Sequence, residues 1–222
     1  MDLDLRDRLD RVFIDIEDAR KSVSQHHIVK IVAVTKYSES EAIEKLYSVG
    51  HRAFGENRVQ DLELKSQKLE ELPIEWHFIG NLQKNKINRL LSLRPSLFQG
   101  LDSLKIAEAI QSRLEERNQK LNALLQINSS YESNKAGVSP EKAKETFLEI
   151  RERFPNINLK GLMTIGSHTT DEVEIGKSFE RTRKIYEELP DVNTLSMGMS
   201  SDSKIAIAEG SNMVRLGSIL FK

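Results

Sequence analysis

The feature of this sequence that most constrains its fold is a repeated alternation between two kinds of segment. Short apolar runs, each ending in polar or glycine residues, alternate with longer stretches whose apolar residues recur three or four positions apart. The first kind is typical of buried parallel strands and the second of amphipathic helices. Eight strands are predicted, at residues 31–36, 52–56, 75–80, 97–100, 123–128, 162–166, 195–199 and 214–217.

Helices are predicted before the first strand and between the strands. The first is a separate N-terminal helix, because Leu5, Leu9 and Val12 recur on one face. Ser38 and Glu41 predict a capping box that opens the helix after the first strand. A basic helix is predicted over residues 82–92.

This order of elements predicts an α/β fold, a single (β/α)8 TIM barrel in which residues 1–222 form one domain. An open doubly wound sheet is the alternative, because the pattern alone separates the two architectures poorly. The eighth strand leaves too few residues for a full helix after it. The N-terminal helix is therefore expected to fill that place in the outer ring.

Composition limits what the chain is expected to bind. Lys and Arg total 33 and Asp and Glu total 34, a balance that argues against binding nucleic acid or an anionic membrane. The chain has no cysteine, which excludes disulfides, thiolate metal sites and cysteine nucleophiles. No metal-binding cluster is recognised. The acidic N-terminus has no signal-peptide pattern, so a cytoplasmic location is expected.

Functional residues of a barrel lie at the C-terminal ends of its strands. Lys36 ends the first apolar run. Apolar neighbours there would disfavour its charged form, which would leave a free amine able to form a Schiff base with an aldehyde. A lysine extending from the strand end into solvent is the other interpretation.

Two Ser/Gly clusters follow the last two strands, where barrels often hold a phosphate group. They are Ser200-Ser201 and Gly217-Ser218, and helix capping or turn formation would explain them equally well. Arg215 points to the same side of its strand as Gly217, because a strand has a period of two. A barrel-facing arginine needs a partner, either a structural ion pair or a ligand.

Two further polar residues occur at neighbouring strands. Asn57 follows the second strand and is either a ligand contact or a polar strand end. His77 lies within the third strand, which favours a hydrogen-bonded buried side chain over a ligand contact.

Together these segments resemble the pyridoxal phosphate homeostasis protein family. The matching motifs run in order through nearly the whole chain: IVAVTK (31–36), FGEN (54–57), WHFIGNLQKNK (76–86), LMTI (162–165), LSMGMSSD (195–202) and VRLG (214–217). The resemblance implies a barrel like the N-terminal domain of alanine racemase, which is fold type III of pyridoxal 5'-phosphate (PLP) proteins.

The resemblance also implies a role for each candidate residue. Lys36 would be the Schiff-base lysine, Arg215 would face the pyridine nitrogen, and Asn57 would lie near the cofactor ring. The phosphate group would be held by Ser200, Ser201, Gly217 and Ser218. Lys135 matches a family lysine near the mouth, and Lys222 stands where the family has glycine.

The implied site favours a binding protein over an enzyme. A charged arginine disfavours a protonated pyridine ring, which weakens carbanion stabilisation. Racemases of this fold take a second acid/base, a tyrosine, from an added β-rich domain that this chain lacks, and Tyr37 is expected to point away from the site. We expect a monomer that buffers, stores or delivers PLP, with PLP-dependent apoenzymes as candidate partners. A racemase-like PLP enzyme and a cofactor-free Schiff-base aldolase are the alternatives.

Overall fold

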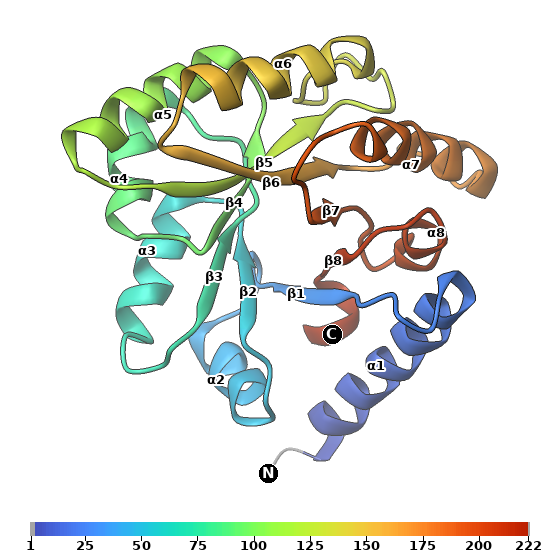
Figure 1. Cartoon of the computed structure of the whole chain (residues 1–222). Helices are drawn as coiled ribbons and strands as arrows, with labels where there is room; N and C mark the ends of the chain where they lie inside the picture. Colours follow the sequence, from blue (N-terminus) through green and yellow to red (C-terminus); the bar gives the residue numbers. More distant parts are fainter. Residues whose placement is uncertain (1–2, 222) are drawn as a thin grey trace.

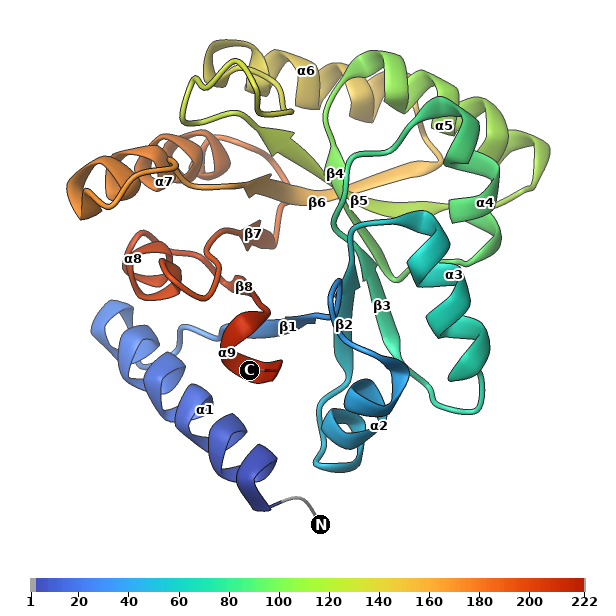
Figure 2. The same ribbon diagram turned by 180° about the vertical axis from the view of Figure 1, so that it is seen from behind.

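The computed structural model describes residues 3–221 as a closed, parallel eight-stranded β-barrel surrounded by helices (Figures 1 and 2). The strands are β1 Lys30–Val34, β2 Ala53–Glu56, β3 Glu75–Phe78, β4 Leu97–Leu101, β5 Leu121–Ile127, β6 Ile157–Thr164, β7 Thr194–Ser196 and β8 Met213–Leu216. Each strand pairs with the next, and β8 pairs with β1. The predicted barrel is confirmed, and this last pairing excludes the open sheet.

Helices follow the strands and form the outer layer (Figure 1). They are α1 Leu3–Val23, α2 Ser40–Ser48, α3 Val59–Lys68, α4 Ile87–Ser92, α5 Leu104–Glu116, α6 Pro140–Arg153, α7 Glu172–Glu187, α8 Ser203–Ala208 and α9 Ser218–Phe221. Within residues 3–221, no helix is both long and apolar enough to cross a membrane.

The N-terminal helix fills the gap that the short C-terminal helix leaves. α1 packs against α8 and α9, and Leu9, Val12 and Ile16 are buried in that contact. Because α9 has 4 residues, it cannot cover β8 and β1 alone. The predicted role of the N-terminal helix in the outer ring is therefore confirmed.

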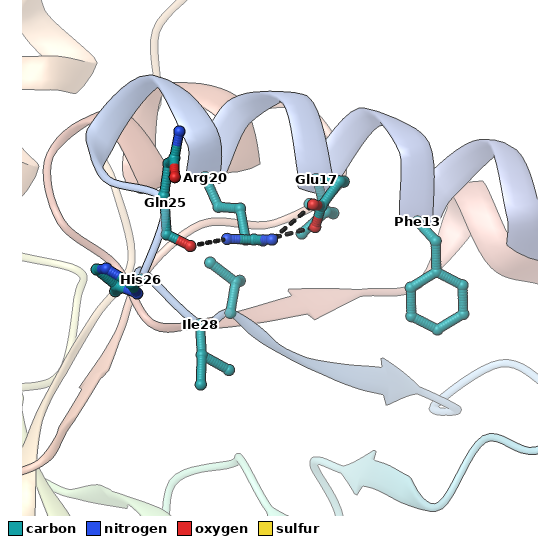
Figure 3. Close-up of a pocket in the computed structure, with 8 residues that line it drawn as sticks. Phe13, Glu17, Arg20, Gln25, His26 and Ile28 are labelled. Atoms are coloured by element: carbon teal, nitrogen blue, oxygen red, sulfur yellow. Dashed lines mark hydrogen bonds and ion pairs between the residues drawn. The ribbon is translucent and has the colours of Figure 1, made fainter.

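Arg20 fastens the loop after α1 to the helix. It forms a two-pronged ion pair with Glu17, and its Nη1 donates to the carbonyl oxygens of Gln25 at 2.9 Å and His27 at 3.1 Å. Glu17, Arg20 and Gln25 border a hollow of about 620 Å³ beside Phe13 and Ile28 (Figure 3). This hollow is thus organised around a structural clamp that sets how the chain enters β1.

Alternate side chains of each strand face opposite sides of the barrel wall, as the period of two requires. The interior holds a small apolar cluster of Val32, Ala53, Leu97, Leu124, Met163 and Met213. The other strand face packs against the helices, where Phe78 and Phe98 stack with ring centroids 5.7 Å apart. Burying each such ring contributes about 1.5–3 kcal/mol.

One local prediction is wrong, and one predicted helix starts two residues later than expected. No side chain caps α2, and Glu39 rather than Ser38 precedes its first residue. The reason is that the backbone N–H of Ser38 donates to the carbonyl oxygen of Thr35 at 2.9 Å, closing a turn at residues 35–38. The helix predicted over 82–92 begins as a 3-10 turn, Lys84–Lys86, and becomes α4 at Ile87.

The end of the barrel opposite the mouth carries an ion pair that should control acid stability. Glu75 accepts hydrogen bonds from His77 and Lys30, which lower its pKa from 4.5 to about 2. A carboxyl whose pKa is lower in the folded state stabilises the fold above the unfolded pKa, and this stability is lost as pH falls towards 2. We expect Glu75→Gln to flatten the dependence of the melting temperature on pH between 4.5 and 2.

The matched control for this prediction is Glu71→Gln, which alters an exposed carboxyl. It should leave the pH dependence close to that of the wild type. A Glu75→Gln variant with the wild-type slope would show that Glu75 does not contribute to acid stability.

Candidate functional site

A cavity of about 840 Å³ opens at the C-terminal ends of the strands. The seven residues that the resemblance assigns to the cofactor line it: Lys36, Asn57, Ser200, Ser201, Arg215, Gly217 and Ser218. Closure of the barrel explains the grouping, because pairing of β1 with β8 brings the two ends of the chain together.

Lys36 lies in the turn after β1. The strand ends at Val34 rather than at residue 36, and the turn at residues 35–38 exposes the Lys36 side chain. The prediction that apolar neighbours desolvate this amine is therefore wrong. Its Nζ lies 4.9 Å from the ring centre of Tyr37, which is 86% exposed and also lines the cavity, contrary to expectation.

A buried ion pair anchors the residue immediately before Lys36. Glu56 is fully buried, and its Oε1 accepts from the Thr35 hydroxyl at 2.6 Å and from Lys65. Lys65 also donates to the Thr35 carbonyl oxygen at 2.6 Å. This group was not among the residues predicted from the sequence, although an acid at the end of a buried strand signals a partner.

The loops after β7 and β8 meet through a hydrogen bond. Gly217 donates its backbone N–H to Ser200 Oγ at 3.2 Å, while Ser201 and Ser218 are exposed at the cavity. Asp202 supports the first loop by accepting from the backbone N–H of Met199. Burial raises the pKa of Asp202, and this hydrogen bond and the charge of Arg215 oppose the rise.

Arg215 is the buried cation of the cavity. Its side chain lies inside the barrel, 4% exposed, and donates from Nη1 to Ser196 Oγ at 2.6 Å and from Nη2 to the Thr164 carbonyl oxygen at 2.8 Å. Burial lowers its pKa to about 10, so it stays charged at neutral pH. Neutral acceptors, rather than the ion pair that the sequence left open, hold this arginine.

Asn57 is placed by a close approach of two backbone segments. A Cβ on Gly80 would lie 2.0 Å from the Asn57 carbonyl oxygen, so the two chains meet because residue 80 is glycine. Asn57 itself is exposed at the mouth.

Of the other residues considered for the site, His77 and Lys135 do not line this cavity. His77 is 1% exposed and bonded to Glu75 and Gln99, which confirms the prediction of a satisfied buried side chain. Lys135 donates to Glu132 and to the Gly166 carbonyl oxygen, and it borders a smaller neighbouring cavity. Lys222 lies outside the described residues 3–221.

Known proteins are similar to this chain in sequence and in fold. The family described as "Alanine racemase, N-terminal domain" matches residues 9–222. The chain is 54% identical over 220 residues to "Pyridoxal phosphate homeostasis protein" of Helicobacter pylori strain J99, covering 99% of both chains. It is similar to the structure of PipY of Synechococcus elongatus with PLP bound, at 29% identity and a TM-score of 0.83, covering 98% of this chain and 100% of that one.

Alanine racemase of Clostridium difficile shares the fold alone. It is 17% identical with a TM-score of 0.71, and the match covers 96% of this chain but 56% of the racemase. Fold and family match thus define the class, a barrel of the alanine racemase N-terminal type. Within that class, the chain belongs to the pyridoxal phosphate homeostasis protein family.

Proposed function

We propose that this protein binds PLP at the barrel mouth and serves PLP homeostasis by holding the cofactor reversibly on Lys36. The observation that carries the proposal is the meeting of an exposed amine, the serines of the loops after β7 and β8 and a buried arginine in one cavity. An aldehyde and a phosphate on one small ring match this set. The relative with 54% identity, named a pyridoxal phosphate homeostasis protein, supports the assignment.

Lys36 would supply the covalent attachment. PLP would supply an aldehyde, and the Lys36 amine is the group that would hold it through a reversible Schiff base. Exposure of Lys36 supports reversible exchange, because water and the aldehyde can both reach the bond. The Glu56–Lys65 pair, which holds Thr35 from behind, would keep the amine aimed into the cavity.

The serine loops would hold the phosphate group. We expect Ser201→Ala combined with Ser218→Ala to weaken PLP binding about 10- to 100-fold, since each lost hydrogen bond costs about 1 kcal/mol. Both serines are exposed, so the fold should be unaffected. Pyridoxal, which lacks the phosphate, should bind the double variant and the wild type with the same dissociation constant. Equal weakening for both compounds would place the phosphate elsewhere.

Arg215 supports binding over turnover. A permanent cation disfavours a second positive charge on the pyridine ring, so the ring is a weaker electron sink. We therefore propose that the protein has no robust turnover. Separately, we propose that it works as a single-domain cytoplasmic monomer. It would buffer or store the cofactor, or deliver it to PLP-dependent apoenzymes. The names of the curated relatives, which are not enzyme names, support this assignment.

One observation favours a racemase-like enzyme instead. Tyr37 lines the cavity next to Lys36, so a second proton-transfer group lies within the same site. Purified protein with PLP and L-alanine tests this alternative. Formation of D-alanine that is lost in both Lys36→Ala and Tyr37→Phe would establish the enzyme and overturn the proposal. Absence of D-alanine formation would support the proposed binding function.

The direct test of the proposed function is PLP uptake by the purified protein. An absorbance scan, borohydride reduction and mass mapping should find one PLP per chain, on Lys36. Lys84, an exposed lysine elsewhere on the chain, is the internal control and should stay unlabelled. Folded protein that retains no cofactor absorbance after free PLP is removed, or a label spread over surface lysines, would overturn the proposal.

A further inference from the structure

A chain of hydrogen bonds leads from Arg215 into the barrel interior. Ser196 Oγ accepts from Arg215 at 2.6 Å and lies 2.7 Å from Gln99 Oε1. Gln99 Nε2 lies 2.9 Å from His77 Nδ1, and His77 Nε2 lies 2.9 Å from Glu75 Oε1. Ser196, Gln99 and His77 are each at most 1% exposed.

This series of hydrogen bonds reaches solvent at the end of the barrel opposite the mouth. Glu75 and its partner Lys30 are the first residues of β3 and β1, and their side chains are 35% and 42% exposed. Polar groups therefore cross the barrel interior from the cavity to its opposite end. Such groups are costly to bury, so each must be hydrogen-bonded.

The direction of every hydrogen bond is set by the arginine. A guanidinium has donors and no acceptor, so Ser196 Oγ accepts from it and directs its own O–H to Gln99 Oε1. The Gln99 amide then presents N–H to His77 Nδ1, which accepts, and His77 donates from Nε2 to Glu75. All the dipoles thus point from the cation towards the carboxylate.

Aligned dipoles of this kind stabilise a buried charge and polarise one another. Gln99 is the link on which the alignment depends, since its amide must accept on one side and donate on the other. Neither Gln99 nor its hydrogen-bond partners Ser196 and His77 line the mouth cavity. Gln99 would therefore affect a ligand through Ser196 and Arg215 rather than by direct contact.

We propose that Gln99 is a positioning residue for Arg215: through Ser196 it holds the guanidinium in place where the cavity receives the PLP ring. The ligand part of this inference rests on the proposed function. The part about Arg215 does not, because it concerns contacts within the chain itself.

Three variants separate this role from a general loss of stability. Gln99→Leu removes the acceptor for the Ser196 hydroxyl. Gln99→Glu keeps an acceptor for the Ser196 hydroxyl but loses the N–H donor to His77, so it tests the Ser196 contact by itself. Gln111→Leu is the matched control, since Gln111 is also buried and hydrogen-bonded but lies on α5, with Glu115 and Asn156 as partners.

The first readout needs no cofactor. In NMR spectra, the Arg215 side-chain N–H signals, assigned by their loss in Arg215→Lys, should exchange slowly with solvent in the wild type, in Gln99→Glu and in Gln111→Leu. They should exchange at least several-fold faster in Gln99→Leu. Equal exchange rates in Gln99→Leu and the wild type would overturn the proposal.

The second readout uses PLP-loaded protein. Gln99→Leu should bind PLP about 3- to 10-fold more weakly, the equivalent of one lost hydrogen bond, and shift the absorbance maximum of the bound cofactor. Gln99→Glu and Gln111→Leu should stay near wild-type affinity. If the wild type takes up no PLP, the proposed function fails while the exchange measurement still decides the role of Gln99. An unchanged spectrum and affinity in Gln99→Leu would overturn its effect on the ligand.

Discussion

Replacing Lys36 with alanine is expected to abolish covalent capture of PLP completely while leaving the barrel folded. The nucleophilic amine of the proposed site is removed, and the neighbouring serines and Arg215 cannot form a C=N bond. The fold should persist because the Lys36 side chain is exposed, with its Nζ over the ring of Tyr37. An exposed cation–π contact contributes about 0.5–1 kcal/mol, so the melting temperature should fall by no more than a few degrees.

Two further variants separate the chemistry from the charge. Lys36→Arg keeps a cation but has no amine that can condense with an aldehyde, so it should also fail to be labelled by borohydride in the presence of PLP. Lys84→Ala should be labelled like the wild type. A Lys36→Ala protein that takes up one PLP per chain on another lysine would show that the cavity does not depend on Lys36.

Replacing Gly80 with alanine is expected to destabilise the protein by about 1–3 kcal/mol, the range for an overpacked interior contact. The new Cβ would lie 2.0 Å from the Asn57 carbonyl oxygen and 2.7 Å from its carbonyl carbon. Neither atom can rotate away, because both belong to the backbone. The loop after β2 must therefore move, and it carries Asn57 at the cavity, so PLP binding should weaken as well.

Gly176→Ala is the control for this substitution. Gly176 lies within α7, and a Cβ there meets its nearest neighbour, Ile205 Cγ2, at an ordinary 3.7 Å. Alanine in a helix is favoured over glycine by about 0.5–1 kcal/mol, so this variant should be more stable than the wild type. Urea unfolding measures both variants. A Gly80→Ala protein as stable as the wild type would show that the backbone around Asn57 yields easily.

Several features of the site follow from local pattern alone. The eight apolar runs and their helices predict the barrel, and the barrel predicts that residues following different strands meet at one mouth. The strand period places Arg215 inside, where it lies. Each inference depends on the order of elements or on neighbours one or two positions apart, which a sequence displays directly.

Other features depend on partners far apart in the chain. Whether Lys36 is buried or exposed depends on a turn closed by Ser38 and Thr35 and fixed by Lys65 on α3. The interior hydrogen bonds join β1, β3, β4, β7 and β8, and no spacing in the sequence signals them.

The sequence by itself determined the alternation of strands and helices and which polar residues follow the strands, because periodicity and strand order are properties of the chain read in one dimension. Only the pairing of β8 with β1 decided that the sheet closes into a barrel. Tertiary structure alone decided how the amine of Lys36 is presented and how the charge of Arg215 is stabilised inside the barrel. The physical reason is that exposure and hydrogen bonding depend on which distant side chains the closing barrel brings within about 3 Å of each other.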